Sequence, residues 1–145
     1  MSDVRIRNAE RRDCERLVEL IVDLGHPISP EKVQSNLLQL QELGLDPLVA
    51  EVEGWVVGLC VPSIMHVLHR DTPVGRISTM VVDREYRSSG IGARLVAEAE
   101  HRLANAGCAL VEVTSNHIRD RAHRFYERLG YRYTSKRFAK SLSPR

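Results

Sequence analysis

The sequence has few aromatic residues and no long apolar run, and each shortage argues against a class of protein. Aromatic residues make up only 5% of the 145 residues, too few for the stacking surfaces of a single-stranded nucleic-acid binder. The net charge of +2, from 21 basic and 19 acidic residues, is also too balanced to indicate a nucleic-acid partner. No apolar run approaches the roughly 18 residues of a membrane helix, so no membrane partner is expected.

Cysteines are also scarce, and this bears on cellular setting and metal binding. The three cysteines, Cys14, Cys60 and Cys108, are far apart in the sequence and odd in number, which indicates reduced thiols and not a disulfide set or a metal cluster. His66 and His69 would face opposite sides of a strand, although they would share one side of a helix. No metal site is expected there, and the two histidines are expected to line a binding pocket instead. Because residues 1–5 lack the apolar segment of a signal peptide, we expect a cytoplasmic protein.

What is present predicts one folded domain spanning residues 1–145. The hydrophobic share of 43% and charged share of 28% are ordinary for a globular protein. Apolar periodicity predicts a mixed α/β fold. The expected strands are 4–7, 47–52, 55–64, 74–82, 108–113 and 131–142, and the expected helices follow Asp13, follow Ser29, span about 90–106 and contain 122–129.

Local signals set several of these boundaries. Asp13 is a candidate helix cap, and Ser29 followed by Pro30 is a typical helix start. Glu53-Gly54 predicts a tight hairpin turn. The apolar run 108–113 predicts a strand near the buried centre of the sheet.

The segment Arg87-Ser88-Ser89-Gly90-Ile91-Gly92-Ala93 carries the sharpest chemical signal. It joins an apolar strand to a long amphipathic helix. The first N–H groups of a helix lack internal partners, and the helix dipole adds partial positive charge there. Glycines at this point let a phosphate approach the backbone closely. A pyrophosphate would fit here, with Arg87 and Arg94 adding charge; two glycines placed for packing alone are the alternative.

Known nucleotide motifs do not match this loop. A P-loop needs Lys-Ser/Thr after its last glycine, where Ala93-Arg94 stands. A dinucleotide fingerprint needs a third glycine where Leu95 stands.

Two segments together resemble the GNAT acetyltransferase superfamily. Residues 81–95, VVDREYRSSGIGARL, look like its acetyl-CoA signature, and residues 122–131, AHRFYERLGY, look like its second signature. The resemblance implies a GNAT fold, with about four helices around a mostly antiparallel central sheet, and acetyl-CoA as co-substrate. It implies that the backbone of Met80, Val81 and Val82 pairs with the pantetheine arm, that Arg87, Ser88, Ser89, Gly90, Ile91, Gly92 and Ala93 hold the pyrophosphate, and that Tyr126 is the general acid. A core aromatic is the alternative role for Tyr126.

The sequence departs from the family pattern at two points. Many relatives carry a glutamate on the strand before the loop, whereas this stretch reads Ile77-Ser78-Thr79-Met80, so the general base stays unassigned among His66, His69, Glu112 and His117. Many relatives also carry an asparagine seven residues before the tyrosine. Arg119 stands there, and Asn116 is carried over as a cofactor contact instead.

The acceptor is expected to be the primary amine of a small molecule. Residues 115–126 and 138–142 look similar to aminoalkylphosphonate N-acetyltransferases, and the basic residues after 119 would suit an anionic amine. A solvated face is the alternative explanation of that charge. Protein or peptide acetylation, a non-catalytic acetyl-CoA sensor and nucleic-acid binding remain competing hypotheses. The resemblance also leaves a homodimer open.

Overall fold

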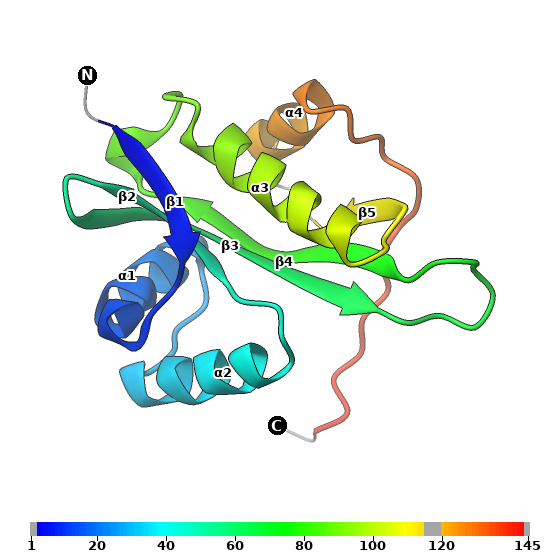
Figure 1. Ribbon diagram of the computed structural model, residues 1–145, viewed down its shortest axis with the longest axis horizontal. Helices are drawn as coiled ribbons and strands as arrows, with labels where there is room; N and C mark the ends of the chain where they lie inside the picture. The colour runs from blue at the N-terminus through cyan, green and yellow to red at the C-terminus, as the bar shows by residue number, and fades with distance from the viewer. Residues whose placement is uncertain (1–2, 115–119, 144–145) are drawn as a thin grey trace. The chain divides into compact units, whose positions relative to one another are not determined.

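A five-stranded sheet forms the frame of residues 1–113 (Figure 1). In spatial order its strands are β1 (Val4–Asn8), β2 (Leu48–Val52), β3 (Trp55–Met65), β4 (Val74–Val82) and β5 (Leu110–Val113). The first four strands pair antiparallel in sequence order, and β5 joins β4 in parallel. The predicted mixed, mostly antiparallel sheet is therefore confirmed.

The computed structural model describes residues 3–114 and 120–143. These divide into two compact units, residues 1–113 and residues 114–145, and each unit is described by itself. Within the described ranges, no helix is both long and apolar enough to cross a membrane.

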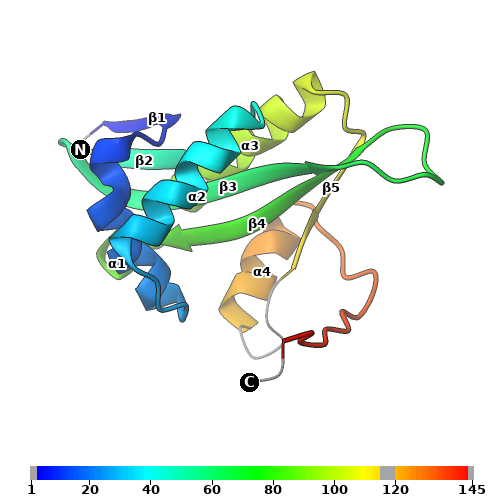
Figure 2. The same ribbon diagram turned by 90° about the horizontal axis from the view of Figure 1, so that it is seen from below.

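Helices cover both faces of the sheet in the first unit (Figure 2). On one face, α1 (Cys14–Leu24) and α2 (Pro30–Glu42) bury Leu17 and Leu37 against strand residues that include Leu59 and Val81. On the other face, α3 (Ile91–Asn105) lies so close that a Cβ at Gly58 or Gly75 would come within 2.9 Å of a leucine methyl of the helix. The sheet is thus the middle of three layers.

Several boundaries follow the predicted local signals. The Ser29 hydroxyl accepts a hydrogen bond from the Lys32 N–H at 3.1 Å, so Ser29 caps α2 as expected. Glu53 and Gly54 both have positive φ, 50° and 80°, which suits the tight turn between β2 and β3.

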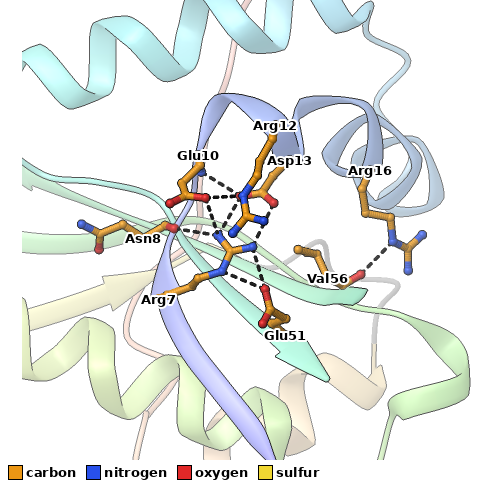
Figure 3. Close-up of polar contacts among 8 residues, drawn as sticks. All are labelled: Arg7, Asn8, Glu10, Arg12, Asp13, Arg16, Glu51 and Val56. Carbon is orange, nitrogen blue, oxygen red and sulfur yellow. Dashed lines mark hydrogen bonds and ion pairs between the residues drawn. The ribbon is translucent and has the colours of Figure 1, made fainter. Parts of the chain in front are cut away.

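Asp13 differs from its predicted role. It does precede α1, but its side chain makes no capping hydrogen bond to that helix. Its carboxylate instead accepts two hydrogen bonds from the Arg7 guanidinium, at 2.8 and 3.0 Å, and one from the Glu10 N–H at 2.7 Å (Figure 3). Glu10 precedes η1 (Arg11–Asp13), the short 3₁₀ turn before α1. The partly buried Arg7 guanidinium, at hydrogen-bonding distance, outcompetes the helix N–H groups for this carboxylate.

The strand expected over 108–113 is shorter and less buried than predicted. It begins at Leu110, and its residues are half-buried or exposed. In the part of the chain that the structure describes, β5 pairs only with β4 and lies at the edge of the sheet. Its apolar composition was a poor guide because an edge strand can be apolar too.

The second unit contains α4 (Asp120–Arg128). The chain that follows has no regular structure over residues 131–143, so the predicted strand 131–142 is wrong. A strand needs a neighbour for its backbone groups, and no described strand pairs with these residues. Tyr133 and Phe138 are 75% and 92% exposed, so their apolar side chains supply no core face either.

Candidate functional site

The predicted pantetheine residues lie where β4 loses one of its two neighbours. β4 pairs with β3 as far as Val82, but it pairs with β5 only from Val74 to Ile77. The β3–β4 register shifts beside Ser78, whose hydroxyl donates to the Val61 carbonyl at 3.3 Å. In the described chain, no strand follows on the β5 side of residues 78–82. This open stretch of strand edge is a ready acceptor of an extended ligand.

Met80, Val81 and Val82 form most of that open edge. Val81 is buried, in the core cluster under α1, while Met80 and Val82 are half-buried. The Val81 side chain packs in the core and holds the strand in place, while the backbone of the strand stays at the open edge. The Val82 carbonyl already accepts a hydrogen bond from Arg87 Nε at 3.1 Å.

The loop after β4 leads directly into α3 by way of η2 (Arg84–Tyr86). Asp83 starts that turn by accepting a hydrogen bond from the Glu85 N–H at 2.9 Å. The Ser89 hydroxyl then donates to the Tyr86 carbonyl. Local side chains thus shape the loop before any ligand binds.

The start of α3 is left open. Gly90 precedes the helix in a left-handed conformation, with φ 85°, and a Cβ placed there would meet nothing within 4 Å. No side chain caps the helix, and its first turn holds no acidic residue. The N–H groups of Ile91, Gly92 and Ala93 therefore lack partners within the helix and meet the positive end of its dipole. This is the geometry of an anion site.

Ser88 carries backbone strain in the same loop. Its φ of 67° lies in the left-handed region, which costs a non-glycine residue on the order of 1 kcal/mol or more. Such strain persists where the surroundings fix the backbone, and it often accompanies ligand contacts. Arg87, Ser88, Ser89 and Gly90 are all exposed, so the loop is accessible to a phosphate.

Asp23 on α1 was missed by the sequence analysis. Its carboxylate pairs with Arg87 Nη2 at 3.5 Å and with Arg84 Nη2 at 3.1 Å. Arg87 is therefore shared between a carboxylate of α1 and the Val82 carbonyl. Asp23 lies more than sixty positions before Arg87, and no spacing rule joins them. By contrast, Arg94 donates to the Val4 carbonyl at 2.9 Å, which directs its charge to β1.

A second contact from α1 holds the start of the loop. Arg16 donates to the Val56 carbonyl at 2.7 Å (Figure 3). It also donates to the Asp83 carboxylate. Its guanidinium also lies 4.4 Å from the centre of the Trp55 ring. The hydrogen bond from the Glu85 N–H, aided by Arg16, holds the pKa of the Asp83 carboxyl below its usual range despite partial burial. These contacts fix where β4 ends.

Tyr126 lies on α4 in the second unit and is 8% exposed. Its ring makes edge-to-face contacts with Phe125 and Tyr131, with centroid distances of 5.0 and 5.7 Å. These contacts fix its ring within that unit. Asn116, the other predicted cofactor contact beyond the first unit, lies outside the described residues, as does His117.

The described candidates for the general base differ in position and in contacts. His66 and His69 are exposed in the connection between β3 and β4. Glu112 lies on β5, where it faces Arg76 of β4 with an Nη1–Oε1 distance of 3.4 Å. Thr79 occupies the stretch where many relatives carry a glutamate, and it is half-buried. In the described ranges, no three His, Cys, Asp or Glu side chains are grouped so that they could hold a metal ion.

Comparison with known proteins gives consistent matches. Residues 14–131 match the profile of the family described as "Acetyltransferase (GNAT) family". An aminoalkylphosphonate N-acetyltransferase from Salmonella typhimurium is 39% identical, and the match covers 94% of this chain and 90% of that protein.

Solved structures agree on the fold. An acetyltransferase from Trypanosoma brucei superposes with a TM-score of 0.82 at 26% identity, covering 97% of this chain and all of that one. An aminoglycoside N-acetyltransferase in complex with CoA superposes with a TM-score of 0.86 at 20% identity, covering 99% of this chain and 97% of that one. The latter likeness concerns the fold alone.

Proposed function

The chain belongs to the GNAT acetyltransferase family and is an N-acetyltransferase that uses acetyl-CoA, and from this premise we propose that its acceptor is the primary amine of a small molecule. One observation carries the acetyl-CoA half of this reaction. The open edge of β4 at residues 78–82 leads to the uncapped start of α3. A strand edge suits the amides of an extended arm, and the helix start suits the pyrophosphate at the end of that arm.

In the proposed reaction the amine attacks the thioester directly. Its nitrogen lone pair forms a bond to the carbonyl carbon, and the carbon–sulfur bond then breaks. The nitrogen loses a proton to a base, and the departing thiolate takes one from the Tyr126 hydroxyl, which regains it from solvent. A thiol with a pKa of about 8.5 is a fair leaving group, and a phenol with a pKa of about 10 can donate to it.

The base carries the harder task. An alkyl amine with a pKa of about 10.4 is mostly protonated at pH 7, and the gap of about 3.4 units corresponds to roughly 4.6 kcal/mol. His66, His69, Glu112 and His117 remain the candidates.

The acceptor we propose is an amine that also carries an anionic group. Support comes from the 39% identical relative, whose name specifies aminoalkylphosphonates.

Cytoplasmic reducing conditions would suit Cys14, Cys60 and Cys108, all of which are buried free thiols.

Release of free thiol from acetyl-CoA, measured across a panel of amines, tests the function. The panel holds aminoalkylphosphonates, polyamines, aminoglycosides, amino acids and lysine peptides. We expect turnover of small amines, and Tyr126→Phe should lower kcat with little change in KM. Turnover of lysine peptides alone would contradict the small-molecule acceptor. An unchanged kcat for Tyr126→Phe would remove its role as acid.

A further inference from the structure

The open edge of β4, residues 78–82, is closed at one end. Pairing between β4 and β5 runs from Val74–Leu110 to Ile77–Val113, and the open edge begins after that last pair. An arm whose pyrophosphate lies at the start of α3 would run along residues 82 to 78, toward Ile77. The thioester end of the arm would therefore point to the closed end of the open edge, at Ile77.

α3 seals one face of the sheet at that end. Gly75 of β4 lies under Leu103, and a Cβ at Gly75 would come within 2.9 Å of a Leu103 methyl and 3.2 Å of its Cβ. Ile77, on the same face of the strand, is 1% exposed. This face is therefore closed to an acceptor at that end, and the opposite face of the sheet is the candidate route.

That opposite face carries a polar row across three strands. Arg76 lies opposite Ser63 of β3 and beside Glu112 of β5, so the three side chains share one face. The cluster beneath α1 and α2 includes Leu59 and the partly buried Val61 of β3 but none of these three residues. The side chains of Arg76 and Glu112 stay 32% and 44% exposed. The row is one residue pair beyond Ile77–Val113.

We propose that Arg76 and Glu112 bind the two charges of a zwitterionic acceptor. Arg76 binds the anionic group of the amine, and Glu112 binds its ammonium. The guanidinium suits the oxygens of a phosphonate, phosphate or carboxylate. This inference rests on the proposed function, because it places the acceptor beside the closed end of the open edge, where the thioester would lie.

The charges in this row suit exchange of partners. Arg76 and Glu112 are 3.4 Å apart, a long ion pair on a partly exposed surface, and such pairs are weak. A zwitterion offers Glu112 an ammonium and Arg76 an anion in exchange for this weak pair. An amine without an anionic group offers Arg76 no such exchange, and a second positive charge on it would be repelled, so the row would select among acceptors.

The first test compares 2-aminoethylphosphonate with propylamine as acceptors for the full chain. We expect Arg76→Gln to raise KM for the phosphonate, so that the kcat/KM ratio of phosphonate to propylamine falls at least about tenfold. The KM for acetyl-CoA should stay the same. Arg102→Gln is the matched control, because Arg102 on α3 is 30% exposed and pairs with Glu98 at 3.0 Å. That variant should leave the ratio unchanged.

Two further variants separate recognition from a structural role. Arg76→Lys keeps the charge but not the two-pronged geometry, and it should restore part of the ratio. Glu112→Gln should raise KM for both amines, because both carry an ammonium. If Arg76→Gln leaves the ratio unchanged, or lowers it no more than Arg102→Gln does, the assignment is wrong. Acceptors that carry phosphate or carboxylate in place of phosphonate identify the preferred anion.

Binding measurements keep this inference distinct from the proposed function. Calorimetry of 2-aminoethylphosphonate with the CoA-loaded protein needs no turnover. Binding that weakens in Arg76→Gln, without turnover of any small amine, would support the row and contradict the function. Turnover of propylamine, with no binding of 2-aminoethylphosphonate, would support the function and overturn the row.

Discussion

The starts of α1 and α3 use charge in opposite ways. Before α1, the Asp13 carboxylate is 6% exposed and lies within hydrogen-bonding distance of Arg7, whose guanidinium also reaches Glu51 at 2.9 Å. At α3, as at α1, no side chain caps the helix, but the first turn of α3 holds no acid, whereas Glu15 lies in the first turn of α1. The first region satisfies its polar groups internally, whereas the second leaves donors for a ligand.

This difference separates residues that hold the fold from residues that we propose bind the cofactor. Burial alone would raise the pKa of the Asp13 carboxyl, but hydrogen bonds from Arg7 and from the Glu10 N–H outweigh it and hold that pKa below its usual value. The hydrogen bond to Asp13 likewise raises the pKa of the Arg7 guanidinium. Both groups are therefore stabilised in their charged forms by the fold itself.

Removing the Asp13–Arg7 contact before α1, which we call the closed region, should cause the largest loss of stability. Asp13→Asn removes the buried Asp13 carboxylate from the partly buried Arg7, and loss of one partner of a buried pair costs about 3 kcal/mol of unfolding free energy. Urea denaturation measures this change. Asp46→Asn is the control, because Asp46 accepts an exposed hydrogen bond from Asn8 at 3.0 Å and should cost less than about 1 kcal/mol. Similar losses in both variants would mean that the Asp13 cluster has no special weight.

Acid should remove the same stabilisation progressively. The folded pKa of Asp13 is depressed, so its contribution is fully present above the ordinary aspartate pKa of about 3.9 and is lost as pH falls through the folded value. Denaturation midpoints measured from pH 6 down to pH 2 should fall more steeply for the natural chain than for Asp13→Asn. Parallel curves would contradict a depressed pKa.

Closing the open region should weaken cofactor binding while sparing stability. Ala93→Asp adds a carboxylate to the first turn of α3, where it complements the helix dipole by about 0.3–1 kcal/mol. The same charge opposes a pyrophosphate, so we expect the Kd for acetyl-CoA to rise at least about tenfold. Calorimetry compares it with Ala93→Asn, which has the same shape without the charge. Equal weakening in both variants would indicate a steric cause and argue against an anion site.

The same contrast shows why sequence predicted some features and not others. Some signals set local structure over only a few residues: glycines, the Ser29–Pro30 pair and the loop between β4 and α3. Turns, the start of α2 and the uncapped start of α3 could therefore be predicted. Asp23 and Arg87 are far apart in the chain, and only the packing of α1 brings them together. The Asp13 prediction failed for a different reason: its partners Arg7 and Glu10 are close to it in the chain and compete with the local cap.

The strand predicted over 131–142 failed for a related reason. Its alternating residues suggested a strand, but a strand depends on a partner that local sequence does not specify. Nothing in that stretch states which backbone it would pair with. The apolar run of β5 likewise gave no information on whether the strand lies at the centre or the edge of the sheet.

The smallest predicted effect concerns Asp23, which places one carboxylate against the open region. Asp23→Asn removes a negative charge 3.5 Å from Arg87 and leaves that guanidinium free to face a phosphate. We expect acetyl-CoA to bind about two- to fivefold more tightly at low salt, with the gain shrinking as salt screens the charges. Unfolding free energy should change by less than about 1 kcal/mol, because the pair is exposed to solvent.

Glu19→Gln supplies the matched control for this effect. Glu19 lies on the same helix and pairs with Arg16 at 3.4 Å, but its side chain is 63% exposed and does not contact Arg87. Titration of acetyl-CoA at several salt concentrations should therefore separate the two variants. If Asp23→Asn binds acetyl-CoA more weakly than Glu19→Gln does, Asp23 orients Arg87 toward the cofactor and does not compete with it. Asp23 of α1 would then belong to the cofactor site together with Arg87.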